Sequence, residues 1–264
     1  MIKNITLGQY FPGESPIHKI DPRTKILLAV ALIVFVFIVK TYIGYAVLFA
    51  YIFTAILMSG IHVKYVLKNL RSLWFILFFT FVLNAFFTSG ETTLFEWWIF
   101  RVTKEGLNQA VFLALRLILL LFATSLLTLT TSPIEFTDGL EKLLKPLTIV
   151  HFPVNELAMM MTIAIRFIPT LLEETDKIMS AQTARGADFE SSSLIKRAYS
   201  LIPLLIPLFV SAFRRANELA LAMEARCYSG GRNRTRMKSL KMGYRDLVSY
   251  LTFCGLIVFI CFGF

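Results

Sequence analysis

The chain has 264 residues, of which 56% are hydrophobic and 14% aromatic, and its formal net charge is +10. Soluble domains contain roughly 45–50% apolar residues, so this composition excludes an ordinary soluble domain and indicates a membrane protein. The three cysteines have neither metal-binding nor disulfide spacing, and the three histidines are scattered singly. The sequence therefore predicts no metal site.

Five apolar runs predict membrane-spanning helices. Several of them are shorter than the ~20 residues that a helix needs to cross a bilayer, so we expect each of these to include flanking residues. We predict an all-α membrane protein with about five transmembrane helices, four of them in a region 1–131 and the last in a region 246–264. The runs occupy residues 26–39, 42–58, 73–87, 107–129 and 247–264.

Two features of the membrane region have more than one interpretation. Trp97 and Trp98 lie beside charged residues between the third and fourth runs, which is typical of the interfacial aromatic belt. We expect a loop on the outer face there, although the apolar alternation also fits a small hairpin. Arg116 lies inside the fourth run, where a charge is costly unless it reaches the interface or meets a partner. Snorkelling, a structural pair and a substrate-pathway role all remain open for it.

The distribution of basic residues predicts the topology. If the N-terminus is inside, 23 of the 27 lysines and arginines lie on the inner side, three lie outside and Arg116 lies within a span. The positive-inside rule therefore places the N-terminus and residues 132–245 in the cytoplasm, and the C-terminus outside. The basic run 232–241 is explained by this orientation and by contact with anionic lipid, and no aromatic platform accompanies it to favour nucleic acid.

The cytoplasmic region 132–245 contains two similar long arms of predicted amphipathic helix. Ser132 and Pro133 predict a short helix before the arms, with serine as the N-cap. Each arm is apolar on one face, is interrupted by proline, and ends in Ala-Arg followed by a small residue. The arginines are 41 positions apart, and the ends are Ala184, Arg185 and Gly186 in the first arm and Ala225, Arg226 and Cys227 in the second.

Prolines and glycines predict the local geometry of the arms. Pro169 lacks an amide proton and predicts a kink in the first arm. Gly186 supplies the left-handed conformation that ends such a helix. Cys227 lacks glycine's conformational freedom, so we expect the glycines at 230–231 to end the second helix. The apolar run 201–213 is too short to cross a bilayer by itself.

Aligning the arms on their Ala-Arg pairs places two acidic residues opposite two basic ones. If the arms cross near their middles, these charges can pair and fix the crossing; otherwise they are solvated faces, and an exposed pair contributes ~0–1 kcal/mol. The residues are Glu173 and Glu174 in the first arm and Arg214 and Arg215 in the second.

The apolar stripes on the arms are either ordinary core or a surface for a partner. Such stripes are usually core; the alternative is an adaptable apolar platform, since methionine is common on surfaces that bind several partners. The candidate platform residues are Met160, Met161, Ile168, Leu171, Leu204, Leu205 and Leu208.

The order and spacing of these pieces resemble the transmembrane T component of energy-coupling factor (ECF) importers of vitamins and metals. The resemblance covers nearly the whole chain, and Cys227 departs from it where the family has glycine. Besides the two Ala-Arg ends, the matching residues are Asp21-Pro22-Arg23-Thr24-Lys25, Thr131-Ser132-Pro133 and Arg166-Phe167-Ile168-Pro169.

The resemblance implies a coupling subunit in a bacterial cell membrane. Arg185 and Arg226 would each dock on one of two ABC-type ATPase subunits, and the apolar faces would hold a small integral-membrane substrate-binding S component. The sequence contains no nucleotide-binding P-loop, so we expect no enzymatic activity and no cofactor in this chain, with ATP and Mg²⁺ bound by the partners.

Other interpretations remain open. The T component is either shared by several S components or dedicated to one cobalt, nickel or biotin system. A channel or secondary transporter is supported by Arg116 alone. A membrane-embedded enzyme would need clustered histidines or carboxylates, which the apolar runs lack. Favourable charge at helix C-termini is an alternative explanation of the two arginines.

Overall fold

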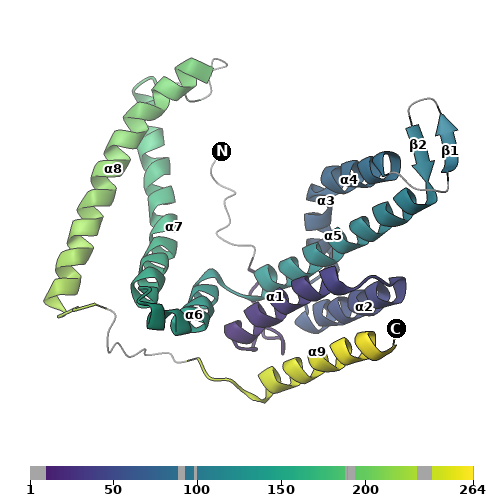
Figure 1. Cartoon of the computed structure of the whole chain (residues 1–264). Helices are drawn as coiled ribbons and strands as arrows, with labels where there is room; N and C mark the ends of the chain where they lie inside the picture. The colour runs from purple at the N-terminus through teal and green to yellow at the C-terminus, as the bar shows by residue number, and fades with distance from the viewer. Residues whose placement is uncertain are drawn as a thin grey trace. The chain divides into compact units, whose positions relative to one another are not determined.

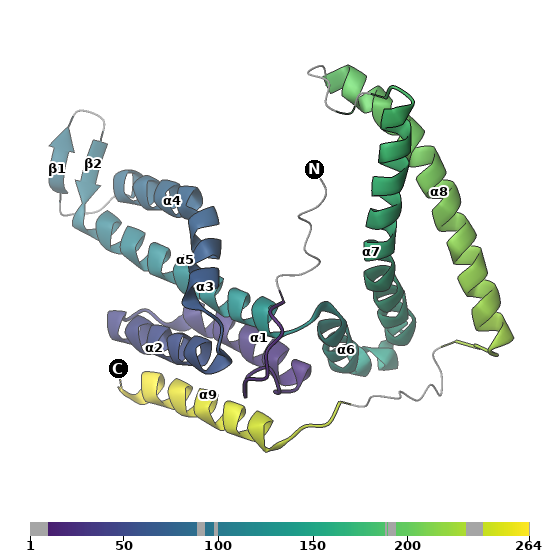
Figure 2. The same ribbon diagram turned by 180° about the vertical axis from the view of Figure 1, so that it is seen from behind.

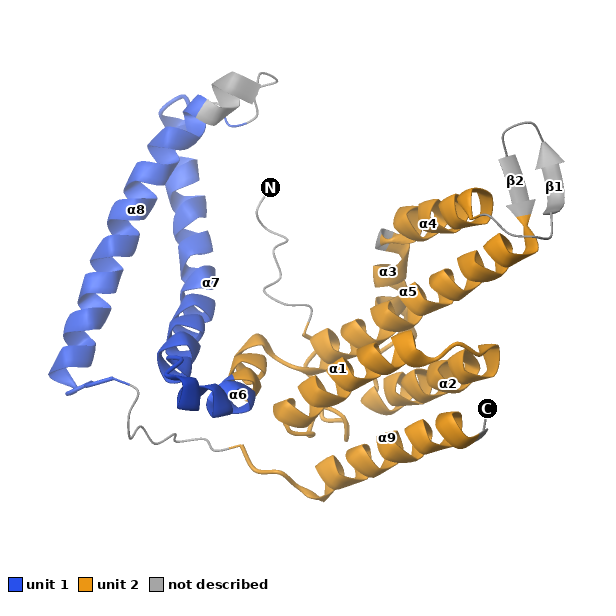
Figure 3. Cartoon of the chain, in the orientation of Figure 1, with its two compact units in different colours: residues 1–7, 141–238 blue, residues 8–140, 239–264 orange. Residues whose placement is uncertain are grey.

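A computed structural model of the chain describes residues 10–88, 93–97, 100–187, 189, 194–230 and 240–263. The chain divides into two compact units (Figure 3). One contains residues 8–140 and 239–264, which we call the bundle unit, and the other contains residues 1–7 and 141–238, which we call the arm unit.

The bundle unit is built mainly from helices (Figure 1). A short two-stranded hairpin, β1 and β2, lies between α4 and α5, and most of α6 also belongs to this unit. Its elements are α1 (Pro22–Ile38), α2 (Tyr42–Ser59), α3 (Val63–Ser72), α4 (Trp74–Phe87), β1 (Thr93–Trp97), β2 (Phe100–Thr103), α5 (Lys104–Thr130), α6 (Pro133–Leu144) and α9 (Tyr244–Gly263).

Helix α5 is the centre of the bundle. Its first turn is capped by Thr103, whose hydroxyl accepts a hydrogen bond from the amide of Gly106. Along its length α5 packs against α1, α2, α3 and α4. Leu119, Phe122 and Ala123 of α5 join the buried core formed with α1, α2 and α9.

The outer faces of the bundle remain strongly apolar. Phe75 and Phe87 of α4 are about three-quarters exposed, and Phe262 of α9 is 88% exposed. Exposed apolar surface on this scale is unfavourable in water and is typical of a lipid-facing surface. This confirms the predicted all-α membrane fold, with the hairpin as a small addition.

Five of the described helices are long and apolar enough to cross a membrane, namely α2, α5, α9 and the arm helices α7 and α8. The first predicted span is α1, which has only 17 residues. The third is α4, which has 14 residues and is bent by 57° relative to α3. The sequence predicts about five spans and five long apolar helices are found, but α7 and α8 stand in the place of the predicted first and third spans.

The segment between α4 and α5 contains a hairpin, which is the alternative that the sequence left open, and its position on the outer face stays a prediction. Strands β1 and β2 pair antiparallel, with Trp97 opposite Phe100 and Glu96 opposite Arg101. Trp98 lies outside the described residues. Alternation of apolar residues with period two was the signal for these strands.

Arg116 has partners within the bundle. Its Nε donates a hydrogen bond of 3.2 Å to the Tyr45 hydroxyl, and its guanidinium lies 5.0 Å from the centre of the Phe37 ring. The Tyr45 hydroxyl in turn donates to the carbonyl oxygen of Val36. These contacts offset the cost of a charge inside a span and favour the structural pair over snorkelling.

A buried polar cluster joins α1, α5 and α9 at one end of the bundle, and we call it the polar junction. Asp21 caps α1 by accepting the amide of Arg23, and its own amide donates to Asp246 of α9 over 2.9 Å. Lys25 donates to the carbonyl oxygens of His18 and Thr130, at 3.0 and 2.9 Å. Three segments distant in sequence are thereby connected.

The polar junction gives a structural role to the motif at residues 21–25. Asp21, Lys25 and Asp246 are each less than 8% exposed, and such groups are tolerated only when they are paired. Gly139 of α6 packs closely on Pro22. This contact joins α6 to α1. The bundle unit therefore continues to residue 140 instead of ending at the predicted boundary after residue 131.

The arm unit consists mainly of two long helices. Ser132 caps the start of α6, as the sequence predicts, and Glu135 completes a reciprocal capping box with it. After the end of α6 a 3₁₀ turn (Lys145–Val150) leads to α7 (Val154–Ala184) and α8 (Leu194–Ala225). Helix α7 continues through Pro169 as one helix. The apolar run 201–213 is part of the 32-residue α8, so its own length does not decide whether it crosses a membrane.

Asp246→Ala should detach the start of α9, because it leaves the amides of Asp21 and Gly243 without their acceptor. Loss of a buried acceptor costs about 1–3 kcal/mol for each donor. We expect a lower unfolding temperature in detergent and faster proteolysis next to α9. Glu14→Gln, at a 95% exposed side chain, is the control. Equal behaviour of the two variants would contradict the stabilising role of the polar junction.

Candidate functional site

The first candidate arginine, Arg185, lies at a helix end of defined geometry. It follows Ala184, the last residue of α7, and Gly186 adopts φ 91°. The amide of Gly186 donates to the carbonyl of Thr183, and that of Ala187 to the carbonyl of Gln182, both at 3.0 Å. This is the Schellman arrangement, and it confirms the left-handed conformation predicted for Gly186.

The second end repeats this arrangement with a cysteine in place of glycine. Cys227 has φ 57°, and its amide donates to Glu224 over 2.8 Å. The amide of Tyr228 donates to Met223 over 3.0 Å. The prediction that Gly230 and Gly231 end this helix is therefore wrong, because Cys227 itself takes the left-handed conformation. Ala184, Arg185 and Gly186 are exposed, as are Ala225, Arg226 and Cys227.

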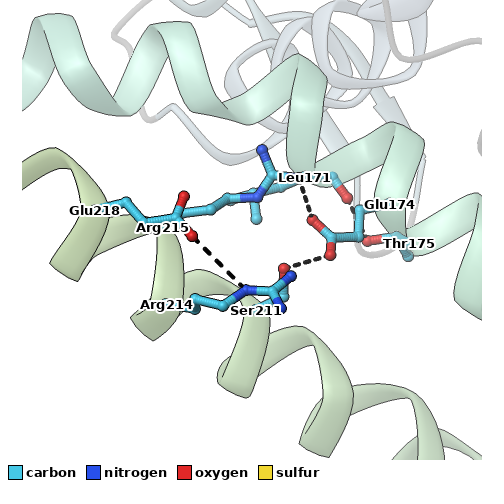
Figure 4. Close-up of polar contacts among 7 residues, drawn as sticks. All are labelled: Leu171, Glu174, Thr175, Ser211, Arg214, Arg215 and Glu218. Carbon is cyan, nitrogen blue, oxygen red and sulfur yellow. Dashed lines mark hydrogen bonds and ion pairs between the residues drawn. The ribbon is translucent and has the colours of Figure 1, made fainter.

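The two arms are joined by polar side chains from both helices, and we call the position of these contacts the crossing (Figure 4). The Arg215 guanidinium lies 2.9 Å from Glu174 Oε2, and the Ser211 hydroxyl donates to the other oxygen of the same carboxylate. Both sides of this pair are partly exposed, at 36% for Arg215 and 20% for Glu174. Arg214 instead lies 4.0 Å from Glu218 on its own helix, and Glu173 is exposed. The structure thus brings together one of the two aligned pairs.

The arms are of equal length when measured from this crossing. Arg185 follows Glu174 by 11 positions (185 − 174), and Arg226 follows Arg215 by 11 (226 − 215). At 1.5 Å per residue, each arginine lies about 16 Å along its helix from the crossing. The helices run antiparallel (Figures 1 and 2), so the arginines lie at opposite ends, roughly 30 Å apart by the same rise.

Favourable charge at a helix C-terminus accounts for either arginine alone. It contributes about 0.3–1 kcal/mol at an exposed position. It does not account for the equal spacing of both from a shared ion pair, nor for the repetition of the same cap. The arrangement presents two permanently charged, planar groups with five N–H donors each, and these suit carboxylate or carbonyl acceptors on a partner.

The predicted apolar platform is only partly available on the surface. Met160, Ile168 and Leu205 are exposed, Met161, Leu171 and Leu208 are half-buried, and Leu204 is buried at 7%. Leu204 is therefore unsuited to a platform in this structure. Leu171 lines a groove of about 270 Å³ between α7 and α8.

Sequence reasoning missed residues whose role depends on distant segments. Ser211 lies in the apolar run 201–213 and has no local signal of a partner, yet it donates to Glu174. Asp246, which completes the polar junction, carried no signal beyond being an acidic residue before an apolar run. A row of large exposed apolar residues on α8 also extends beyond the predicted set; it comprises Leu201, Ile202, Ile206, Phe209, Val210 and Phe213.

Cys227→Gly should strengthen the second cap. The left-handed conformation destabilises a residue with a Cβ by roughly 1–2 kcal/mol, and glycine avoids this cost. Glycine also loses more conformational entropy on folding, which reduces the gain by about 0.5–1 kcal/mol. We therefore expect amide hydrogen exchange near residue 227 to slow about two- to fivefold. The reverse change, Gly186→Cys, should accelerate exchange near residue 186. Unchanged exchange in both variants would contradict the strain at Cys227.

Comparison with known proteins gives consistent results. The family model described as CbiQ, a cobalt transport protein, matches residues 13–237. Among curated relatives, an energy-coupling factor transporter transmembrane protein EcfT from Clostridium kluyveri is 56% identical over 98% of this chain and 95% of its own length. EcfT proteins from Thermosediminibacter oceani and Brevibacillus brevis are 56% and 53% identical, covering 95% and 93% of this chain and 94% and 93% of their own lengths.

The match includes the bundle helices α1 to α5 and both arginine caps, which are the features that carried the resemblance in the sequence. The identity holds over nearly the full length of each relative. The chain belongs to the CbiQ/EcfT family of transmembrane components of energy-coupling factor transporters.

Proposed function

We propose that the chain couples ATP hydrolysis by two partner ATPase subunits to uptake by a substrate-binding S component in the membrane. The observation that carries this proposal is the pair of matched caps, with Arg185 and Arg226 each 11 positions beyond a residue of the Glu174–Arg215 pair. Two equal arms suit a partner with two similar subunits, one for each arginine.

The chemistry of the tips supports docking on protein. Each guanidinium is exposed, and each helix end is held rigid by its cap, so little conformational entropy is lost when a partner binds. An acidic or carbonyl-lined groove on each ATPase provides the matching acceptors. ATP and Mg²⁺ are bound by those subunits in this proposal, since the chain has no P-loop.

The apolar face of the arm unit supports a membrane-embedded partner. Phe209, Val210 and Phe213 of α8 are between 61% and 71% exposed, and Met160 of α7 is 60% exposed. These side chains flank the ion-paired crossing in sequence. A tilt of one arm about the crossing would therefore move this face as well as the arginine tips.

The orientation follows from charge. With the N-terminus and the arm unit on the cytoplasmic side, the arginine tips face the compartment that contains ATP, and the C-terminus is outside. The excess of basic residues on one side of the apolar runs supports this orientation. The long apolar helices and the organisms of the similar transporter proteins support a multi-pass position in a bacterial cell membrane.

Purification from native membranes in mild detergent tests the proposal. We expect two P-loop ATPases to co-purify with the chain, together with several different small membrane proteins if the subunit is shared. A single S component would indicate a dedicated system. Recovery of the chain without ATPases would overturn the proposal.

Arg185→Glu combined with Arg226→Glu should release both ATPases, because each substitution reverses the charge presented to its groove. We expect at least a tenfold loss of ATPase co-purification, equivalent to about 1.4 kcal/mol. Lysine at both positions should restore binding only in part, since lysine lacks the bidentate fork. Arg214→Glu, at a 75% exposed residue away from the caps, is the matched control. Full retention of ATPases by the double glutamate variant would refute the docking role.

Exchanging the charges at the crossing tests transmission separately from docking. Glu174→Arg or Arg215→Glu alone places like charges together at the crossing and should reduce substrate uptake while ATPase binding persists. The double exchange should recover part of the lost uptake. Stability should change by only ~0–1 kcal/mol, since the pair is partly exposed. Exchange of Arg214 and Glu218, which lie on one helix, is the control. An unchanged rate of substrate uptake in all of these variants would contradict a role for the Glu174–Arg215 pair.

A further inference from the structure

The bundle unit contains a large pocket that the coupling mechanism does not use. Its volume is about 450 Å³, which lies within the roughly 300–1,000 Å³ of small-molecule sites. It is lined by residues of α1, α2, α5 and α9 and of the segment before α1. All of these belong to the bundle unit.

The pocket follows from the way α9 is attached. At one end, Asp246 accepts the amide of Asp21 at the start of α1. Towards the other end, Ile260 packs beside Gly44 at the start of α2. Between these attachments the space beside α9 is lined by small residues of the other helices, among them Ala29, Ala55 and Ala123. The helix is thus attached at both ends, and in its middle Phe253 packs beside Tyr51 of α2 at the edge of the pocket.

The walls of the pocket are mostly apolar. Leu28, Leu32 and Ile52 line it from α1 and α2, while Val248 and Phe253 line it from α9. A space of this size would hold many waters, at about 30 Å³ each, yet such walls offer water few hydrogen bonds. An apolar chain is therefore the favoured occupant of a pocket with these walls.

One end of the pocket is cationic. Arg245 and Lys25 are the two charged residues among those described as lining it. The Lys25 ammonium already donates to the carbonyl oxygens of His18 and Thr130 and lies near Asp21, Asp246 and Glu135, so Arg245 is the cation that a ligand can reach. Lys25 lies at the start of α1 and Arg245 at the start of α9, close to Thr130 at the end of α5. An apolar pocket with a cationic mouth complements an anionic amphiphile.

We infer that this pocket binds one anionic phospholipid, with an acyl chain between α9 and the α1, α2 and α5 walls and the phosphate near Arg245. The membrane supplies this ligand continuously. With the orientation proposed above, the cationic mouth faces the cytoplasmic leaflet, where anionic lipids are enriched. The binding itself does not depend on that orientation or on the ATPases. The bound lipid fills the space left beside α9 and stabilises the bundle.

Native mass spectrometry of the purified full-length chain tests this inference. The detergent-solubilised protein is incubated with phosphatidylglycerol or with phosphatidylcholine of the same acyl chains, and separately with inorganic phosphate. We expect one phosphatidylglycerol to be retained at least tenfold more than phosphatidylcholine. Phosphate alone should neither bind nor compete, because it cannot fill the apolar walls. Equal retention of both lipids, or displacement by phosphate, would overturn the inference.

Variants locate the binding. Arg245→Gln should lower phosphatidylglycerol retention about fivefold or more, and Ala55→Phe should abolish it by filling the pocket. Arg71→Gln, on α3 outside the pocket lining, is the matched control. If Ala55→Phe is not monodisperse, the smaller change Ala55→Met replaces it, with reduced retention expected. Retention that is unchanged in Arg245→Gln and in the folded Ala55 variant would show that the lipid binds elsewhere.

Discussion

The ion pair between Glu174 and Arg215 is the interaction on which the geometry of the arm unit depends. It is worth little as a contribution to stability, because both side chains are partly exposed. Its importance is that it joins α7 and α8 at one defined register. The Ser211 hydroxyl occupies the second oxygen of the Glu174 carboxylate and so fixes the register further. From this pair, each helix continues for 11 residues to an exposed arginine, and both helices end in the same type of cap.

The bundle unit uses polar groups differently. At the polar junction, Asp21, Lys25 and Asp246 are buried, so breaking one partner leaves another without compensation. This makes the attachment of α9 to α1 specific as well as strong. Arg116 is likewise held, by the Tyr45 hydroxyl and the Phe37 ring. Charges inside the bundle therefore organise helices, whereas the exposed charges at the arm ends remain available to partners.

Much of the fold is predictable from local pattern, and most of what was missed is long-range. Apolar runs and capping residues identify most of the helices, although not the amphipathic α3, and the 41-residue spacing of the arginines identifies the repeat. The same alignment brought Glu174 and Arg215 into register, but it did not separate them from Glu173 and Arg214, because the choice depends on helix rotation at the crossing. The partner of Asp21 lies 225 positions away at Asp246, which no local signal indicates. The prediction for Cys227 failed for another reason: the hydrogen bonds of the helix cap hold it in a backbone conformation that a residue with a Cβ disfavours.

The central claim is that the arms move when the partner ATPases change state. The distance between the two tips is its most direct measure. Spin labels on Cys227 and on Ala187→Cys, with Cys254 and Cys261 replaced by serine, report this distance by pulsed electron resonance in the assembled complex. Ala187 is chosen because it leaves the Gly186 cap intact. The account predicts that the distance distribution shifts between the nucleotide-free and ATP-bound complexes. Identical distributions in both states, in a complex that still hydrolyses ATP and imports substrate, would contradict it.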